Sequence, residues 1–171
     1  MKTLLLIDWQ NTDYKNSDRQ HSDVAIENGK KLLNIWRSKN LNLVHVLLDS
    51  EKIFQTNAWR RTRLKQESPI LDNSIITGFA PQDGEPYLWK PDRSAFFGTQ
   101  LENMLSAGQE VYCTGASTTG CVLATAIHGD ALGYQMHFVH DCMFDKDEQR
   151  HNKGVEILGK FGRVVNHNDI V

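Results

Sequence analysis

Short apolar runs alternate with amphipathic stretches along this chain. The apolar runs are typical of strands buried in a parallel sheet, and they predict strands at Leu4–Ile7, Leu41–Leu48, Val111–Cys113, Met136–Val139 and Val164–Val165. The stretches between them predict helices at Asp23–Lys39, Thr99–Ala107, Cys121–Ala131 and Asp147–Phe161. Thr99 and Glu102 have the spacing of a capping box. The alternation predicts an α/β fold with three α/β/α layers and a mostly parallel, doubly wound sheet.

Length and composition narrow the class of protein. The 171 residues suit one domain, residues 1–171, because no linker-like stretch divides them. A net charge of −2 without a basic block argues against a nucleic-acid partner. The first apolar run is too short for a signal peptide or a membrane span, and three cysteines without paired spacing suit a reducing compartment. We therefore expect a cytoplasmic protein that has no membrane partner.

Cys121 stands where a predicted strand turns into a predicted helix, after the small residues of Gly115–Gly120. A thiol in the first helical turn lies near unpaired backbone N–H groups and the positive end of the helix dipole, which favour the thiolate. The alternative is a buried thiol that acts as a small hydrophobe, which is how Cys113 and Cys142 are interpreted.

Two further residues stand at comparable places. Asp8 ends the first strand, and Lys90 ends the short run Tyr87–Trp89. Taken singly, such an acid is often a helix cap and such a lysine often only extends to solvent. In a parallel sheet, however, sites form beyond the carboxyl ends of the strands. We therefore expect Asp8, Lys90 and Cys121 to converge as a base, a cation and a nucleophile.

Other classes fit less well. Gly115–Gly120 has the spacing of a phosphate-binding loop, but Cys121 and Val122 replace the Lys and Ser or Thr of that motif. A redox role for Cys121 has no resolving cysteine nearby in the sequence. A catalytically retired metabolite-binding protein stays open as an alternative, although all three positions are occupied.

Three segments resemble the isochorismatase-like cysteine hydrolases. They are Leu4-Leu-Leu-Ile-Asp-Trp-Gln, Trp89-Lys-Pro-Asp-Arg-Ser-Ala-Phe-Phe-Gly-Thr-Gln-Leu and Thr114-Gly-Ala-Ser-Thr-Thr-Gly-Cys-Val, and the similarity continues to Asp141, which is expected to end the next strand. The resemblance implies a catalytic triad of Asp8, Lys90 and Cys121. It also implies a cis peptide bond between Ala116 and Ser117, and an oxyanion hole formed by Ser117 and Cys121. The implied reaction is covalent hydrolysis through a thioester without a cofactor.

Departures from family members refine the expected substrate. Nicotinamidases carry an Asp-x-His and a further His that bind a metal, whereas this chain has Asp49 without either histidine, so we expect no metal. Several vinyl-ether hydrolases of the isochorismatase type lack the cysteine, so Cys121 favours cleavage of a C–N bond. Gly120-Cys-Val-Leu-Ala-Thr resembles the subgroup that hydrolyses N-carbamoyl amino acids and maleamate, although Leu123 replaces an Arg often found there. The vinyl-ether reaction remains the alternative.

Candidate substrate contacts come from aromatic and polar residues around these segments. Thr56–Leu64 is a candidate lid, in which Arg60, Arg61 or Arg63 could bind a carboxylate, although surface arginines are common. The remaining candidates are Trp9, Gln10, Trp59, Tyr87 and Phe96. We expect a small-molecule substrate and a homo-oligomer, a dimer or higher.

Overall fold

The centre of the computed structural model is a six-stranded sheet in which all paired strands run parallel. The structure describes residues 1–56, 58–65 and 72–170. In spatial order the strands are β3 (Tyr87–Lys90), β2 (Asn42–Leu48), β1 (Lys2–Ile7), β4 (Glu110–Ala116), β5 (Gln135–Phe144) and β6 (Arg163–Val165). The expected three-layer α/β fold is confirmed, and the sheet is parallel throughout.

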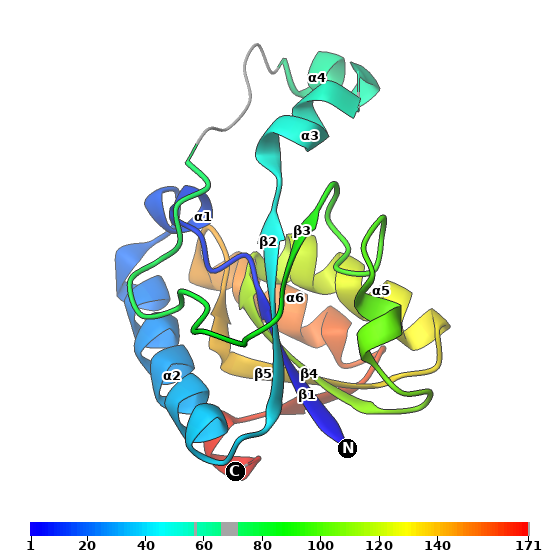
Figure 1. The fold of residues 1–171 in the computed structure, drawn as a ribbon. Helices are drawn as coiled ribbons and strands as arrows, with labels where there is room; N and C mark the ends of the chain where they lie inside the picture. Colours follow the sequence, from blue (N-terminus) through cyan, green and yellow to red (C-terminus); the bar gives the residue numbers. More distant parts are fainter. Residues whose placement is uncertain (57, 66–71, 171) are drawn as a thin grey trace.

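Helices cover both faces of this sheet (Figure 1). On one face, α2 (Arg19–Ser38) packs on Leu4, Leu6 and Val139. On the other, α5 (Leu123–Ala131) and α6 (Glu148–Leu158) pack on alternate strand residues such as Leu5 and Ile7. Strands buried on both faces must be apolar at consecutive positions, which explains the uninterrupted runs in the sequence. Among the described residues, no helix is both long and apolar enough to span a bilayer.

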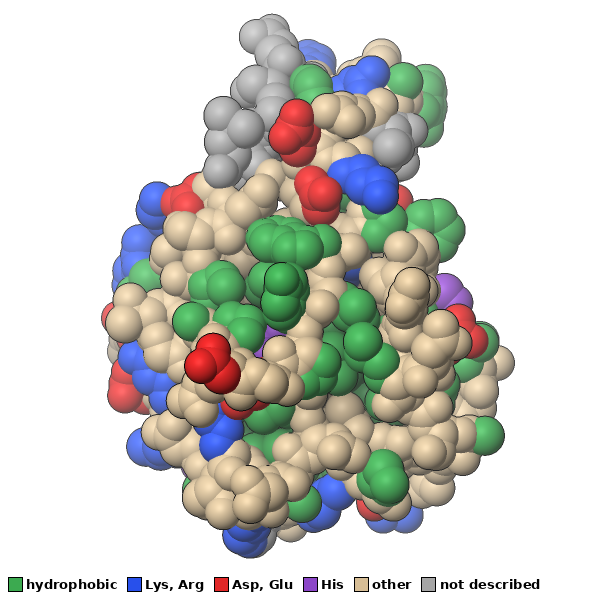
Figure 2. Space-filling view, in the orientation of Figure 1, with side chains coloured by type: hydrophobic (Ala, Val, Ile, Leu, Met, Phe, Trp, Pro, Cys, Tyr) green, Lys and Arg blue, Asp and Glu red, His purple; other side chains and the backbone are tan. Residues whose placement is uncertain are grey.

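Shorter helices lie beyond the carboxyl ends of the strands. Helix α1 (Asn11–Lys15) follows β1, whereas α3 (Ser50–Thr56) and α4 (Ala58–Leu64) follow β2 and project away from the body of the molecule (Figure 1). Below this projection, hydrophobic side chains gather in the middle of the face that carries β2 and β3 (Figure 2). Within the described residues, the expected lid Thr56–Leu64 comprises the last residue of α3 and the whole of α4.

Several expected boundaries are wrong. Helix α2 begins four residues earlier than expected, β4 continues three residues further, and α6 ends three residues earlier. Three other differences lie closer to the site. The predicted helix Thr99–Ala107 is a single 3-10 turn, Leu101–Met104. The Thr99 hydroxyl donates to the Ala95 carbonyl and accepts from the Leu101 N–H, so it does not make the expected capping box with Glu102. Helix α5 starts at Leu123, after a π-helical turn over Thr118–Val122 that contains Cys121. Strand β5 continues to Phe144, so Asp141 lies inside it. Its pairing with β4 jumps from Cys113–Phe138 to Gly115–Met143, which places a bulge in β5.

Candidate active site

Asp8 lies at the carboxyl end of β1, directly after Ile7. It has a left-handed backbone conformation with φ 49°, which is uncommon outside glycine, and its N–H donates to the Val46 carbonyl at 2.9 Å. The side chain has no exposed surface. An unusual backbone held by a neighbouring strand is typical of a functional position, because the surrounding structure must compensate for its strain.

Lys90 is the last residue of β3 and is also completely buried. Its Nζ lies 2.8 Å from Asp8 Oδ2 and donates to the Asp92 carbonyl at 3.1 Å. Neither oxygen of Asp8 accepts a well-aligned hydrogen bond within the described part of the chain. The carboxylate therefore has a cation beside it and lone pairs still able to accept a proton.

Cys121 lies in the turn Thr118–Val122, with 8% of its surface exposed. The turn is closed by hydrogen bonds from the backbone N–H groups of Gly120 and Val122 to the Ser117 carbonyl, at 3.0 and 3.2 Å. The Ala116–Ser117 peptide bond at its start is cis. The thiol interacts with both Asp8 and Lys90, so the structure brings the three predicted catalytic residues together.

Burial controls the proton affinities of this trio. It raises the pKa of Asp8 against the opposing charge of Lys90. Burial and the neighbouring carboxylate of Asp8 also raise the pKa of the Cys121 thiol well above its ordinary value, although Lys90 acts in the opposite direction. Burial would lower the pKa of Lys90, but Asp8 and Cys121 outweigh it and the pKa is raised. Burial and the Asp8 carboxylate thus oppose the thiolate that a helix start favours, and ionisation of the thiol depends on a base beside it.

Asp145, directly after β5, holds the turn Thr118–Val122 in place. Its Oδ2 accepts hydrogen bonds from the backbone N–H and the hydroxyl of Thr119, both at 2.7 Å. Burial would raise the pKa of Asp145, but these bonds, with those from Lys146 and Arg150, lower it. The sequence did not indicate Asp145 as a site residue, because the strand before it was expected to end at Asp141.

A cavity of about 220 Å³ adjoins the turn at Ser117. Asp13 of α1 forms part of its wall. Burial and the Asp8 carboxylate raise the pKa of Asp13 to about 7. The other lining residues are Asn16, Ser117, Phe144, Asp145, Lys146 and Arg150. The lining thus combines two cationic side chains with two carboxyl groups, of which Asp145 pairs with Arg150 and Asp13 titrates near neutral pH.

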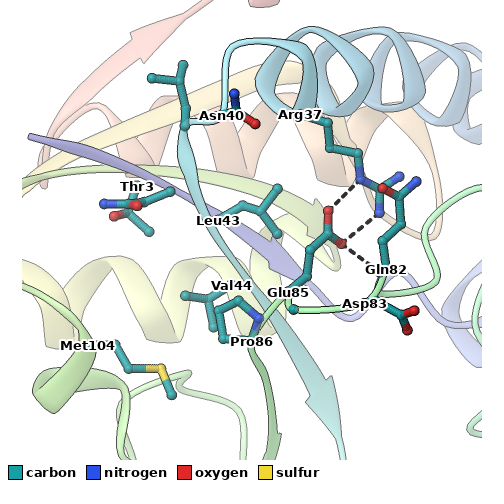
Figure 3. A pocket seen from close by; sticks show the side chains of 13 residues that line it. Thr3, Arg37, Asn40, Leu43, Val44, Gln82, Asp83, Glu85, Pro86 and Met104 are labelled. Carbon is teal, nitrogen blue, oxygen red and sulfur yellow. Dashed lines mark hydrogen bonds and ion pairs between the residues drawn. The ribbon is translucent and has the colours of Figure 1, made fainter.

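A larger cavity, of about 560 Å³, lies at the amino ends of β1, β2 and β3 (Figure 3). Its main charged group, Glu85, is paired with Arg37 Nε at 2.7 Å and His45 Nε2 at 2.8 Å. Catalytic groups of parallel sheets are found at the opposite, carboxyl ends. We therefore interpret the Arg37–Glu85–His45 network as structural.

Several expected substrate contacts have other roles. Trp9 is buried and stacks on Phe79, with ring centroids 3.9 Å apart. Phe96 is buried and stacks on Tyr134. Gln10 joins β1 to β2 by accepting from the Leu48 N–H at 2.8 Å and donating to the Leu48 carbonyl at 3.2 Å. These three side chains hold the framework of the site and, like the three predicted catalytic residues, do not line the 220 Å³ cavity.

The remaining expected contacts lie on the surface or outside the description. Trp59, on α4, is 73% exposed, and Tyr87 is 57% exposed at the start of β3, the end opposite Lys90. Arg61 donates to the carbonyls of Phe54 and Gln55. Arg63 is exposed, and the side chain of Arg60 lies outside the described residues. None of the described members of this group lines the cavity beside Ser117.

Comparison with known families identifies the chain. The Isochorismatase domain model matches residues 2–169. The chain belongs to the isochorismatase family. Within this family, a maleamate amidohydrolase of Pseudomonas putida is 37% identical over 153 residues, covering 85% of this chain and 72% of that protein. An uncharacterized isochorismatase family protein of Bacillus subtilis is 27% identical, covering 82% of this chain and 72% of that protein.

Solved structures of the isochorismatase family share the fold. An isochorismatase-like hydrolase from Alkaliphilus metalliredigens superposes with a TM-score of 0.80 at 23% identity, covering 98% of this chain and 96% of that one. A hydrolase of the isochorismatase family from Chromobacterium violaceum superposes with a TM-score of 0.76 at 28% identity, covering 99% of this chain and 91% of that one. These structures share the fold, and the family match together with the similarity to the maleamate amidohydrolase identifies this protein as an isochorismatase-family hydrolase.

Alkylation tests the reactivity of the cysteines. All three are buried, but Cys121 retains exposed surface and has the Lys90 cation near its thiol, whereas Cys113 and Cys142 are 0% exposed. We expect iodoacetamide at neutral pH to modify Cys121 first, as measured by peptide mass spectrometry. Faster modification of Cys113 or Cys142 in the folded protein would contradict the activated-thiol interpretation.

Proposed function

We propose that this hydrolase cleaves the C–N bond of a small amide or N-carbamoyl compound through a thioester on Cys121. The observation that carries the proposal is the buried Lys90–Asp8 ion pair beside the Cys121 thiol. Of these three residues, Cys121 is the one that retains exposed surface. Similarity to a maleamate amidohydrolase supports amide hydrolysis. Intact triad positions argue against a retired binding protein.

The proposed reaction begins with transfer of the Cys121 Sγ proton to Asp8. Sγ then attacks the substrate carbonyl carbon, and the N–H groups of Ser117 and Cys121 stabilise the resulting oxyanion. The C–N bond breaks as Asp8 returns the proton to the leaving nitrogen, which releases ammonia or an amine. Water then gives a proton to Asp8 and attacks the thioester. The C–S bond breaks, the carboxylic acid leaves, and the thiol regains its proton.

The cavity beside Ser117 supports a substrate with a carboxylate. Its volume of about 220 Å³ suits a compound of few carbon atoms. Lys146 and Arg150 provide positive charge, and Arg150 also pairs with Asp145 through its Nε at 3.2 Å. We propose that Lys146 attracts the carboxylate while the amide carbonyl faces Cys121.

A panel of amides tests this function through the release of ammonia. We expect maleamate and similar short acid amides to be hydrolysed with a higher kcat/KM than uncharged amides of the same length. Lys146→Met should raise KM for the acid amides, whereas Lys153→Met, an exposed lysine of α6 outside the cavity lining, should not. A preference for uncharged amides, or equal effects of the two variants, would contradict the carboxylate assignment.

We expect substrate binding to depend on pH because Asp13 lines the cavity. Its pKa of about 7 means that it is mostly neutral below pH 7 and negatively charged above it. The charge that appears above pH 7 should repel an anionic substrate, so KM for an acid amide is expected to rise as pH increases through 7. Asp13→Asn should remove this rise. Superimposable KM profiles for the two proteins would contradict the role of Asp13.

Chelation is expected to leave turnover intact. The proposed chemistry uses Asp8, Lys90 and Cys121, and the Asp49 segment lacks the histidines of metal-dependent relatives. Its Asp49 carboxylate instead accepts a hydrogen bond from the Lys52 N–H at 3.0 Å. Dialysis against EDTA followed by an ammonia assay measures the effect. Loss of turnover that added zinc restores would revive a metal-assisted mechanism.

A further inference from the structure

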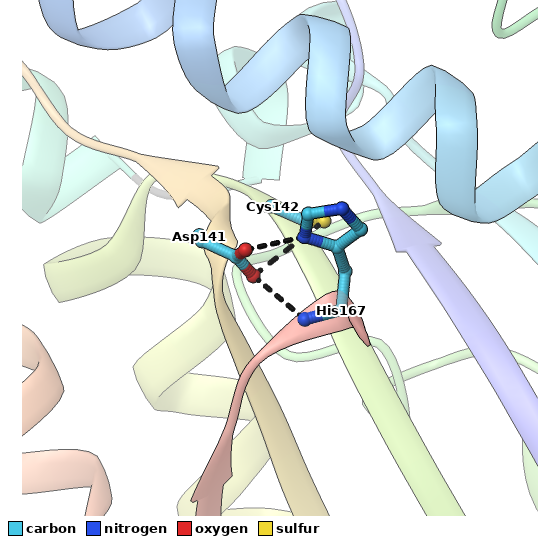
Figure 4. A group of neighbouring side chains, drawn as sticks. All are labelled: Asp141, Cys142 and His167. Carbon is cyan, nitrogen blue, oxygen red and sulfur yellow. Dashed lines mark hydrogen bonds and ion pairs between the residues drawn. The ribbon is translucent and has the colours of Figure 1, made fainter. Parts of the chain in front are cut away.

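Three donor groups of different chemistry meet away from the proposed catalytic trio. Asp141 and Cys142 are neighbours in β5, and His167 begins the 3-10 turn His167–Asp169 that follows β6. One carboxylate oxygen, the Cys142 sulfur and one ring nitrogen of His167 all lie within 4.8 Å of one another (Figure 4). Cys142 belongs to the core cluster on the α2 face, whereas Cys121 belongs to the cluster on the other face.

The bulge in β5 explains how consecutive side chains can converge. In a regular strand Asp141 and Cys142 would point to opposite faces. Between the pairs Cys113–Phe138 and Gly115–Met143, however, β5 advances five residues while β4 advances two. This irregularity removes the alternation locally, and Cys142 Sγ lies 3.9 Å from Asp141 Oδ1. The same carboxylate accepts from the His167 backbone N–H at 3.0 Å, which holds the histidine in place.

We propose that Asp141, Cys142 and His167 bind a zinc ion. Thiolate sulfur, imidazole nitrogen and carboxylate oxygen are the ligands that zinc uses in proteins. Tetrahedral ligands at about 2.0–2.3 Å from zinc are about 3.3–3.7 Å apart, so donors within 4.8 Å need only small movements.

The solvent exposure and the ionisable groups of these three side chains are compatible with a zinc site. The side chains of Asp141 and His167 retain 17% and 10% exposure, so an ion can enter from solvent, while Cys142 forms the buried end. On binding, a Zn–S bond forms as the thiol proton leaves to solvent, and the imidazole nitrogen exchanges its contact with the carboxylate for the metal. A water from solvent completes four ligands. The bound ion would link the segment after β6 to β5.

Cobalt and zinc binding test the site without an activity measurement. The EDTA-treated full-length protein is titrated with Co²⁺, and the absorption of a cobalt–thiolate bond is recorded. We expect about one equivalent to bind with this absorption, and Zn²⁺ to displace it and raise Tm. Cys142→Ser should lose the absorption, and Asp141→Asn and His167→Gln should weaken binding by about tenfold or more. Cys121→Ser is the matched control and should bind like the wild type.

Three outcomes would overturn the proposal. One is the absence of cobalt–thiolate absorption in the wild type. Another is absorption that survives in Cys142→Ser but disappears in Cys121→Ser, which would locate the metal at the proposed catalytic thiol. The third is a lower Tm for Asp141→Asn with no response of either protein to zinc, which would make the Asp141–His167 contact purely structural. If Cys142→Ser does not fold, His167→Gln, which changes a side chain nearer the surface, provides the binding comparison.

Discussion

Cys121→Ala should reduce kcat/KM for the best amide substrate by at least about 10³-fold, because residues that act together in covalent catalysis lose function together. Asp8→Asn and Lys90→Met should cost a similar factor, and combining them with Cys121→Ala should add little. The physical reason is that the buried thiol has a raised pKa and needs Asp8 to ionise it, while Lys90 holds the Asp8 carboxylate at 2.8 Å. Steady-state release of ammonia, with circular dichroism to verify folding, measures these effects.

Cys113→Ala is the matched control for this loss. Cys113 is also a fully buried cysteine, but it lies within β4. Its variant should lose stability and retain most of the turnover. Near-normal turnover by Cys121→Ala would instead favour the vinyl-ether alternative, in which Asp8, whose pKa burial raises, acts as a general acid without a covalent intermediate.

Gly115→Ala should lower the free energy of unfolding by at least about 4 kcal/mol, a loss reserved for severe local disruption. Gly115 has φ 109°, and an added Cβ would lie 1.8 Å from the Ile7 carbonyl oxygen. That oxygen belongs to β1, which pairs with β4 at this position and leads directly to Asp8. Relief of the clash would have to separate the two central strands. Chemical denaturation measures the change.

Gly133→Ala separates the cost of the left-handed backbone conformation from the cost of the clash with the Ile7 carbonyl. Gly133 also has a positive φ, 82°, but, apart from its chain neighbours, none of the described residues has an atom within 4 Å of the position that its Cβ would take. This variant should cost only about 1–2 kcal/mol, the usual penalty for a left-handed conformation. Equal losses for the two variants would show that close packing of Gly115 against β1 is not what limits the substitution.

The fold and the meeting of Asp8, Lys90 and Cys121 could be predicted from the sequence for one physical reason. Parallel strands buried on both faces must be apolar throughout, so their ends are visible as the first polar residues. Because those ends share one edge of the sheet, Asp8 and Lys90 are placed near each other without any knowledge of side-chain geometry.

Other features depend on contacts that periodicity does not encode. The bulge in β5 depends on the pairing of this strand with β4. Because the strand was expected to end at Asp141, the sequence did not indicate that Asp145 holds Thr119. Aromatic residues are equally apolar in the core and in a pocket, so sequence could not tell that Trp9 stacks on Phe79. A helix start favours a low pKa for Cys121, but burial and the neighbouring Asp8 carboxylate raise that pKa, and periodicity shows neither of them.

Trapping of the covalent intermediate tests the central claim most directly. The enzyme is mixed with maleamate, or with the best amide of the panel, quenched in acid during turnover and digested for mass spectrometry. We predict an acyl adduct on the peptide that contains Cys121, with the mass of the substrate less ammonia, and none on Cys113 or Cys142. Rapid turnover of that substrate with no adduct on Cys121, together with undiminished turnover by Cys121→Ala, would contradict the thioester mechanism.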